Sequence, residues 1–221
     1  MKRDHWTESD IRELKSRIDA TDLVCGVDEV GRGPLAGPVV ACAIIMPKGE
    51  RIEGVRDSKK VSEIKREKLY DQILEHCIAW GIGQSSEQFI DEINIRQATL
   101  RAMKEAVEAL TDHQGHHVIP ELVVIDAETI DIAYPQIGII HGDDRIYTIS
   151  CASIVAKVYR DRQMIALAEK YPEYDLAKNK GYGTKAHMEA IRKFGILPIH
   201  RRSFIHEEGL REYQEKHSTS R

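Results

Sequence analysis

Cysteine is scarce in this chain, and long apolar runs are missing. The 221 residues include four cysteines, none of them in a Cys-x-x-Cys pair, so the sequence predicts neither a zinc site nor a disulfide framework. No apolar run reaches the roughly 18–20 residues that a transmembrane helix requires. The first residues, MKRDHWTESD, also lack the apolar core of a signal peptide. We therefore expect a soluble, cytoplasmic protein that does not enter a membrane.

The chain also has little net charge, −4 with histidine neutral, which argues against a protein that binds polyanions over its whole surface. This average hides an uneven distribution, because residues 178–202 contain seven Lys or Arg and one Glu. An acidic body joined to a basic segment suits a metal site that faces a phosphate backbone. A charged face that is merely solvated is the alternative explanation.

The length and the 42% hydrophobic content suffice for one large compact domain. No internal repeat, low-complexity tract or long linker divides the sequence. We predict one continuous unit with three parts: an N-terminal helix at 1–20, a core at 21–175 and a basic helical segment at 176–221.

Hydrophobic periodicity predicts the order of helices and strands. Helices are predicted at 7–20, 62–77 and 93–110, from about 146 past 162, and at 185–194 and 205–214. Strands are predicted at 23–28, 39–46, 78–84 and 121–128, and the run QIGIIH at 136–141 repeats the pattern. The turn GRGPLAGP joins the first two strands as a hairpin, whereas the later strands alternate with helices. This order predicts a mixed α/β sheet.

Acidic residues end three of the apolar runs. Asp28 and Glu29 follow VCGV, Asp126 follows LVVI, and Asp143 and Asp144 follow GIIHG. Functional groups gather at strand ends in open α/β sheets, so we expect these acids to converge. Clustered carboxylates repel one another and need a cation, and oxygen ligands favour Mg²⁺ or Mn²⁺ over zinc. Capping of a helix or turn is the alternative for a single Asp, and we prefer it for Asp144.

Such a cluster indicates phosphodiester chemistry. Two metal ions held about 3.5–4 Å apart activate a water and stabilise the leaving oxygen of an in-line displacement. A P-loop enzyme fits less well, because GRGPLAG is not followed by the Lys-Ser or Lys-Thr of that motif.

With these acids in place, the sequence resembles ribonuclease HII, the prokaryotic type 2 ribonuclease H, over nearly its whole length. Several motifs carry the resemblance together. They are GVDEVGRGPLAGPVV at 26–40, DSKK at 57–60, NIRQATLRAM at 94–103, VVIDA at 123–127, GDDRIYTISCASIVAKVYRDR at 142–162, KGYGTKAH at 180–187 and IHRRSF at 199–204.

The resemblance implies a ribonuclease H-like fold, with a mixed five-stranded sheet flanked by helices and a C-terminal helical extension. It also implies an endonuclease that cleaves the RNA strand of RNA/DNA hybrids. Such an enzyme also cuts 5′ of a lone ribonucleotide in duplex DNA, leaving 3′-hydroxyl and 5′-phosphate ends. The four metal-binding acids of the family correspond to Asp28, Glu29, Asp126 and Asp143, with Mn²⁺ or Mg²⁺ expected as cofactor in a two-metal site.

The resemblance further implies contacts at the RNA-to-DNA junction. Gly31, Arg32 and Gly33 correspond to a glycine-arginine-glycine element near the ribose 2′-hydroxyl, and Tyr182 to a tyrosine near the adjoining deoxyribose. Glycine lets a backbone come close to a ligand, and the 2′-hydroxyl distinguishes RNA from DNA. A tight turn is the alternative for the glycines, and a packed turn for the tyrosine.

Further residues are expected near the substrate backbone. By resemblance these are Lys59, Asn94, Ser153 and Lys157. A solvated side chain is the alternative for the lysines, and a helix N-cap for Asn94. Additional phosphate contacts are considered at His187, His200, Arg201 and Arg202, with a capping or core position as the alternative for the histidines.

Two positions depart from the family pattern, since His141 stands where a lysine is common and Ala127 where a glycine is common. We expect a monomer that acts on RNA/DNA hybrids or on duplex DNA containing ribonucleotides. No sliding-clamp peptide is evident in REYQEKHSTSR. The alternatives are a ribonuclease H-like DNA nuclease or resolvase, and a non-catalytic nucleic-acid-binding module that retains the basic segment.

Overall fold

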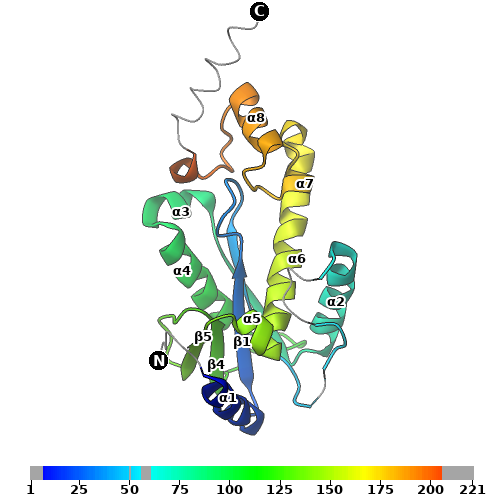
Figure 1. Ribbon diagram of the computed structural model, residues 1–221, viewed down its shortest axis with the longest axis vertical. Helices are drawn as coiled ribbons and strands as arrows, with labels where there is room; N and C mark the ends of the chain where they lie inside the picture. The colour runs from blue at the N-terminus through cyan, green and yellow to red at the C-terminus, as the bar shows by residue number, and fades with distance from the viewer. Residues whose placement is uncertain (1–6, 50, 56–60, 206–221) are drawn as a thin grey trace, which may run out of the picture.

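The computed structural model describes residues 7–49, 51–55 and 61–205. A five-stranded sheet lies at its centre, with the strand order β3-β2-β1-β4-β5 (Figure 1). The strands are β1 (Val24–Val30), β2 (Val39–Ile45), β3 (Ala79–Ser85), β4 (Leu122–Asp126) and β5 (Gln136–Ile139). The first three are antiparallel neighbours, whereas β4 is parallel to β1 and β5 is parallel to β4. The predicted mixed sheet and hairpin are confirmed.

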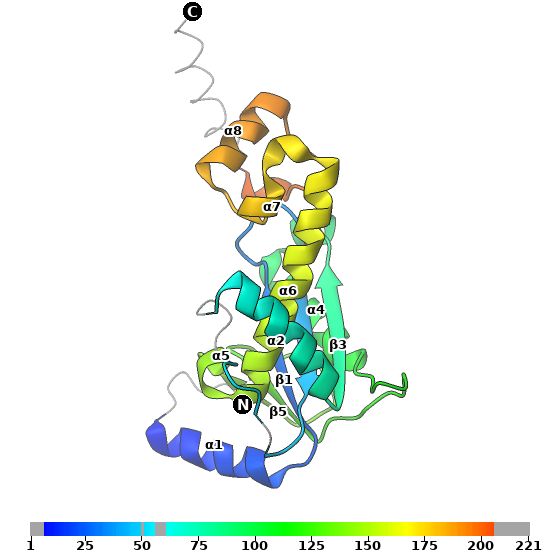
Figure 2. The ribbon, with the colours of Figure 1, turned by 90° about the vertical axis from the view of Figure 1, so that its right-hand side faces the viewer.

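Helices cover both faces of this sheet (Figure 2). They are α1 (Glu8–Ala20), α2 (Glu63–His76), α3 (Glu87–Ile93), α4 (Ile95–Glu108), α5 (Gly142–Arg145), α6 (Tyr147–Lys170), α7 (Leu176–Asn179) and α8 (Lys185–Phe194). Short 3-10 turns occur at Pro172–Tyr174 and Arg202–Phe204. On one face α4 packs against β2 and β3, and on the other α6 packs against β1 and β2.

Side-chain alternation along the strands divides the core between these two faces. Cys25 of β1 packs in the cluster that contains Met103 of α4, whereas Cys42 of β2 packs in the cluster that contains Ile154 of α6. All four cysteines are buried free thiols, as expected from their scattered positions.

Gly26 allows α6 to approach the central strand closely. A Cβ atom at this position would lie 2.3 Å from the carbonyl carbon of Thr148, in the first turn of α6. Because residues two apart in a strand share a face, Asp28 points to the same side as Gly26. The missing side chain at Gly26 thus brings α6 against the strand that carries Asp28.

The structure differs from the prediction at the end of β1 and before α4. β1 continues to Val30, so Asp28 and Glu29 lie within the strand and not beyond its end. The helix predicted at 93–110 is confirmed as α4, whereas α3, which precedes it and meets it at Asn94 with φ 74°, was not predicted. The Asn94 side-chain oxygen accepts a hydrogen bond from the Gln97 amide at 3.1 Å. Asparagine adopts a positive φ more readily than most residues, and its side chain caps α4, so the chain turns there.

The segment after α6 forms a small core of its own and contacts the β1–β2 turn. The core contains Met164, Tyr174, Leu176, Ala190, Ile191 and Ile205. The amides of Leu35 and Ala36 donate to the Gly181 carbonyl, and the Gly37 amide donates to the Ile199 carbonyl. Helix α8 matches the prediction, whereas the helix predicted at 205–214 falls, after Ile205, outside the described residues.

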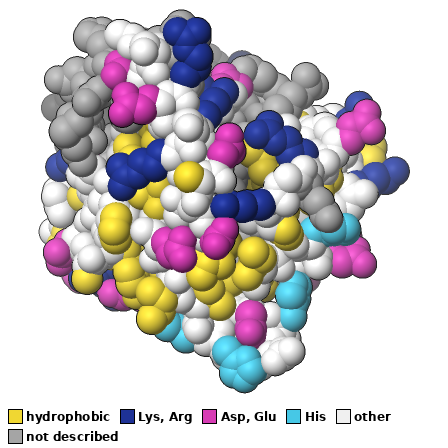
Figure 3. All heavy atoms as spheres, turned by 90° about the horizontal axis from the view of Figure 1, so that it is seen from below, with side chains coloured by type: hydrophobic (Ala, Val, Ile, Leu, Met, Phe, Trp, Pro, Cys, Tyr) yellow, Lys and Arg dark blue, Asp and Glu magenta, His cyan; other side chains and the backbone are white. Residues whose placement is uncertain are grey.

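The two ends of the molecule differ in composition. Seen from the α1 end, acidic, basic and hydrophobic side chains lie interspersed (Figure 3). The basic segment 178–202, which includes α8, lies at the opposite end (Figure 1). Within the described residues, every helix is too short or too polar to pass through a membrane.

Candidate active site

Asp28 is held in the interior of the molecule between β1 and α6. It is 5% exposed, and its Oδ1 atom accepts a hydrogen bond of 2.8 Å from the Glu29 amide. The Ser153 hydroxyl of α6 also hydrogen-bonds to the Asp28 carboxylate. Ser153, predicted near the substrate backbone, therefore lies at Asp28, where it orients the carboxylate.

Asp126 lies beside Asp28 on the neighbouring strand. The parallel register of β1 and β4 pairs Val27 with Ile125, so the next residue of each strand is an aspartate. The Asp126 Oδ1 atom accepts a hydrogen bond of 2.7 Å from the Gly142 amide. Asp126 therefore ends the apolar run LVVI, as the sequence predicts. The hydrogen bond from Gly142 links the start of α5 to Asp126.

Asp143 is not at the end of a strand, and this part of the prediction is wrong. β5 ends at Ile139, and Asp143 lies in the short helix α5. The Ser150 hydroxyl of α6 donates a hydrogen bond to the Asp143 carbonyl oxygen at 2.7 Å, and Asp143 is buried, with 8% of its surface exposed. The positive φ of 56° at His141 turns the chain between β5 and α5. The hydrogen bond from the Gly142 amide to Asp126 therefore places the backbone next to Asp143 beside the other acids.

Three of the carboxylates are close enough to affect one another's pKa. Burial, then the charges of Glu29 and Asp126, raise the pKa of Asp28 well above its ordinary value, although the Ser153 hydrogen bond opposes this shift. Burial also raises the pKa of Glu29, despite the guanidinium of Arg32 at 3.4 Å from Glu29 Oε1. Three acids in mutual range with one exposed arginine leave negative charge uncompensated, so the cluster favours a bound cation.

The donor atoms fit a hard divalent cation, because all four acids offer carboxylate oxygens. They do not form a closed cage: within the described residues, no three His, Cys, Asp or Glu side chains are arranged to hold a metal ion. Asp28, Glu29 and Asp126 thus interact with one another, and their side chains would have to move to close around an ion.

The glycine-arginine-glycine turn lies immediately after these acids. Gly31 has φ 91°, in the left-handed region that favours glycine. A Cβ atom at Gly33 would lie 3.8 Å from Cε1 of Tyr182, which is 42% exposed. The structure therefore brings Tyr182, from the segment after α7, beside the turn that follows Glu29.

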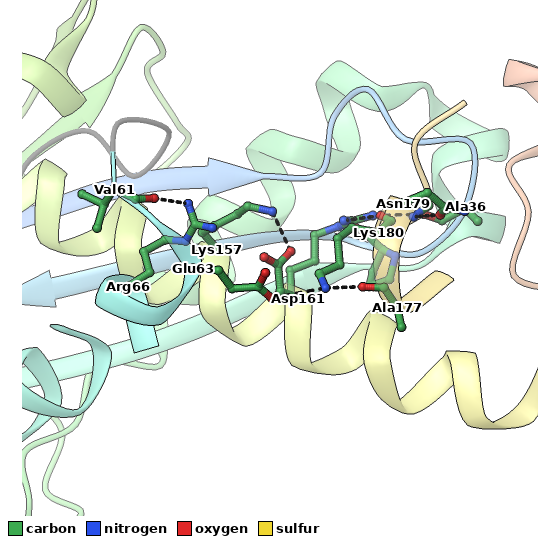
Figure 4. A network of polar contacts seen from close by, with 12 residues as sticks. Ala36, Val61, Glu63, Arg66, Lys157, Asp161, Ala177, Asn179 and Lys180 are labelled. Carbon is green, nitrogen blue, oxygen red and sulfur yellow. Dashed lines mark hydrogen bonds and ion pairs between the residues drawn. The ribbon is translucent and has the colours of Figure 1, made fainter. Parts of the chain in front are cut away.

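The remaining substrate-contact candidates are placed differently. Lys157 forms an ion pair of 2.6 Å with Asp161 on its own helix (Figure 4). Asn94 caps α4, which is the alternative that the sequence left open. Lys59 lies outside the described residues.

Comparisons with known proteins agree with this arrangement. Residues 25–207 match the family model for ribonuclease HII. The chain is 54% identical over 195 residues to ribonuclease HII of Alkaliphilus metalliredigens, covering 87% of this chain and 96% of that relative. It is 48% identical over 203 residues to ribonuclease HII of Bacillus mycoides, covering 92% of this chain and 77% of that relative. The chain belongs to the ribonuclease HII family. Membership makes it a ribonuclease H, and therefore a hydrolase.

Solved structures support the same fold. The ribonuclease H2 of Pyrococcus horikoshii superposes with a TM-score of 0.70 at 26% identity, over 87% of this chain and 99% of that one. A ribonuclease HIII determined in complex with Mn²⁺ superposes with a TM-score of 0.66 at 16% identity, over 89% of this chain and 71% of that one. The predicted ribonuclease H-like fold is confirmed.

Two arginines near the candidate site were not predicted to be buried. Arg160 and Arg201 are both fully buried, and both hydrogen-bond to carbonyls of the 31–38 turn. Arg201, considered as a phosphate contact from the sequence, is therefore not on the surface. His187 and His200 are also buried, with their Nε2 atoms 3.2 Å apart, so the core alternative holds for both histidines. Sequence patterns do not separate a buried arginine from an exposed one, because the residue type is nearly always exposed.

Proposed function

We propose that this ribonuclease HII is a divalent-metal-dependent endonuclease that cleaves the RNA strand of RNA/DNA hybrids and incises 5′ of ribonucleotides embedded in duplex DNA. The products would carry 3′-hydroxyl and 5′-phosphate ends, and the reaction would begin the removal of ribonucleotides from DNA. The observation that carries the proposal is the acid cluster at Asp28, directly before the turn that approaches Tyr182; burial and then the neighbouring carboxylates raise the pKa of Asp28.

The four acids would bind the metal cofactor, and other residues would orient them. Asp28, Glu29, Asp126 and Asp143 would together hold the divalent cations. Bound Mg²⁺ or Mn²⁺ supplies an activated water and stabilisation of the leaving oxygen. The chain supplies orientation: the Ser153 hydroxyl fixes the Asp28 carboxylate, and the Gly142 amide fixes that of Asp126.

The turn and the basic segment would hold the substrate. The turn at Gly31, Arg32 and Gly33 would contact the ribose at the junction, and Tyr182 would stack on the adjoining deoxyribose. Lys157 and Lys59 would contribute positive charge toward the substrate backbone, with Asn94 as a further backbone contact. This arrangement favours an enzyme over a binding module, because a module that only binds has no use for buried acids beside the junction site.

The proposal predicts a substrate pattern. The purified protein should nick a DNA duplex with one ribonucleotide on the 5′ side of that residue and cut an RNA/DNA hybrid, in Mg²⁺ or Mn²⁺ but not in chelator. An all-DNA duplex of the same sequence should stay intact. Gel analysis of end-labelled strands measures all three substrates. Equal cleavage of the all-DNA duplex would indicate the DNA nuclease alternative, and binding without cleavage the non-catalytic module.

A further inference from the structure

The turn between β1 and β2 is held from the inside by the two buried arginines. Arg201 donates hydrogen bonds to three carbonyl oxygens of this turn, from Nη2 to Gly31 at 2.6 Å, from Nη1 to Arg32 at 2.9 Å and from Nε to Gly37 at 3.0 Å. Its guanidinium thus contacts both ends of the turn. Because the residue is 0% exposed, it does not reach a nucleic acid itself.

Arg160 of α6 holds the second half of the same turn. It donates from Nη2 to the Ala36 carbonyl at 3.0 Å and from Nε to the Pro38 carbonyl at 2.9 Å. A third hydrogen bond, from Nη1 to the Lys180 carbonyl at 2.9 Å, links the turn to the segment that carries Tyr182. A Cβ atom at Gly31 would lie 2.3 Å from Arg160 Nε, so glycine is required there for the guanidinium to fit.

Burying two cations so close together is unfavourable unless their donors are satisfied. Within the described residues, every hydrogen bond of the two guanidiniums is accepted by a main-chain carbonyl. Burial and the charge of Arg160 lower the pKa of Arg201 to about 9, which leaves it protonated at neutral pH. The charge of Arg201 is therefore directed at the carbonyl oxygens of the turn.

This arrangement fixes the direction of the amides. The described chain contains no cis peptide bond, so each N–H points away from the carbonyl of the same peptide unit. The carbonyls of Gly31 and Arg32 point toward Arg201, and the amides of Arg32 and Gly33 consequently point away from it. Successive amides with a common direction form a concave site for an oxygen atom of a ligand.

We propose that Arg201 is a positioning residue for ribonucleotide recognition: it holds the carbonyls of Gly31 and Arg32 inward so that the next two amides face the sugar of the substrate. The proposal rests on the proposed function for the identity of that sugar. It assigns to the interior of the protein a specificity role that the exposed Arg32 and Tyr182 do not fulfil alone. Arg160 supports the same turn from the opposite side.

The test compares binding of two duplexes that differ in a single 2′-hydroxyl. Fluorescence anisotropy in chelator measures the affinity of the full chain for DNA with one ribonucleotide and for the same DNA without it. We expect the unaltered protein to prefer the ribonucleotide by about tenfold, since one hydrogen bond contributes about 1.4 kcal/mol in a favourable case. Arg201→Met, which keeps the length but removes the donors, should reduce this preference to less than about twofold.

Arg202→Met is the matched control. Arg202 is exposed, and its loss should weaken the binding of both duplexes alike while leaving the preference unchanged, as expected for a phosphate contact. Arg201→Lys keeps the charge but not the forked donors, and should retain an intermediate preference. It also provides a second comparison if the Met variant does not fold, as judged by thermal unfolding.

The outcomes separate this proposal from the proposed function. Full preference in a folded Arg201→Met or Arg201→Lys protein would overturn the positioning role, as would an unaltered protein without any preference. Cleavage by the same unaltered protein in Mg²⁺ tests the nuclease separately. A protein that prefers the ribonucleotide but cuts nothing would leave the role of Arg201 standing and remove the nuclease.

Discussion

Asp28→Asn should lower the rate of cleavage at an embedded ribonucleotide by about 10³-fold or more, because the loss of several kcal/mol of metal-borne charge stabilisation corresponds to at least that factor. Asparagine has nearly the same shape and still accepts hydrogen bonds from Ser153 and from the Glu29 amide. What it removes is the charge at the centre of the acid cluster. Single-turnover cleavage with saturating enzyme measures the effect on the chemical step.

Asp144→Asn is the control for this substitution. Asp144 is exposed and adjoins Asp143 on α5, so the variant makes the same chemical change beside the cluster. We expect its cleavage rate to stay within about twofold of the unaltered protein, as for a typical surface substitution. Full activity of the Asp28 variant, or an equal loss in the Asp144 variant, would contradict the assignment of the four acids.

The same Asp28→Asn substitution should stabilise the protein in chelator at neutral pH. The folded-state pKa of Asp28 is raised above its value in the unfolded chain, so stability falls as the pH rises from the ordinary carboxyl pKa to the raised pKa and stays lower above it. Removing the charge should raise the melting temperature by about 2 °C or more, which corresponds to roughly 1 kcal/mol in a chain of this size. Scanning calorimetry in chelator measures the difference.

The pH and metal dependence of this effect have definite signs. The advantage of the variant should shrink as the pH falls below the raised pKa of Asp28, and it should disappear below the ordinary carboxyl pKa, where Asp28 is protonated in both the folded and the unfolded protein. Mn²⁺ at about 100 times its dissociation constant should stabilise the unaltered protein by about 2.7 kcal/mol and the variant by much less. A variant that is less stable than the unaltered protein in chelator at pH 7 would show that the acids are not in repulsive contact.

Local sequence patterns were sufficient for most of the sheet and for part of the site. The run LVVID predicted both β4 and the position of Asp126, because a strand covered on both faces needs consecutive apolar residues up to its end. The end of β1 was less evident, since Asp28 and Glu29 interrupt the apolar pattern although the backbone continues to pair with β2 through Val30. Charge in a sequence suggests a loop, whereas hydrogen bonding to a neighbour decides the strand.

The features that were missed depend on contacts between distant segments. Asp143 is placed by the Gly142 amide and by Ser150, and neither contact follows from the apolar run before it. Arg201 is separated from Gly37 by more than 160 residues, and its burial depends on how the segment after α6 returns to the β1–β2 turn. The basic composition of 178–202 suggested surface contacts, but Arg201 in this segment is buried and donates hydrogen bonds to the β1–β2 turn.

The most direct test of the central claim is anomalous diffraction from crystals of the protein soaked in Mn²⁺. The account predicts a manganese peak in contact with the carboxylate of Asp28 and with at least one further acid among Glu29, Asp126 and Asp143. The same peak should be absent in Asp28→Asn crystals. Manganese bound only at other residues, or bound at this cluster without Asp28, would contradict the claim that these acids form the metal centre.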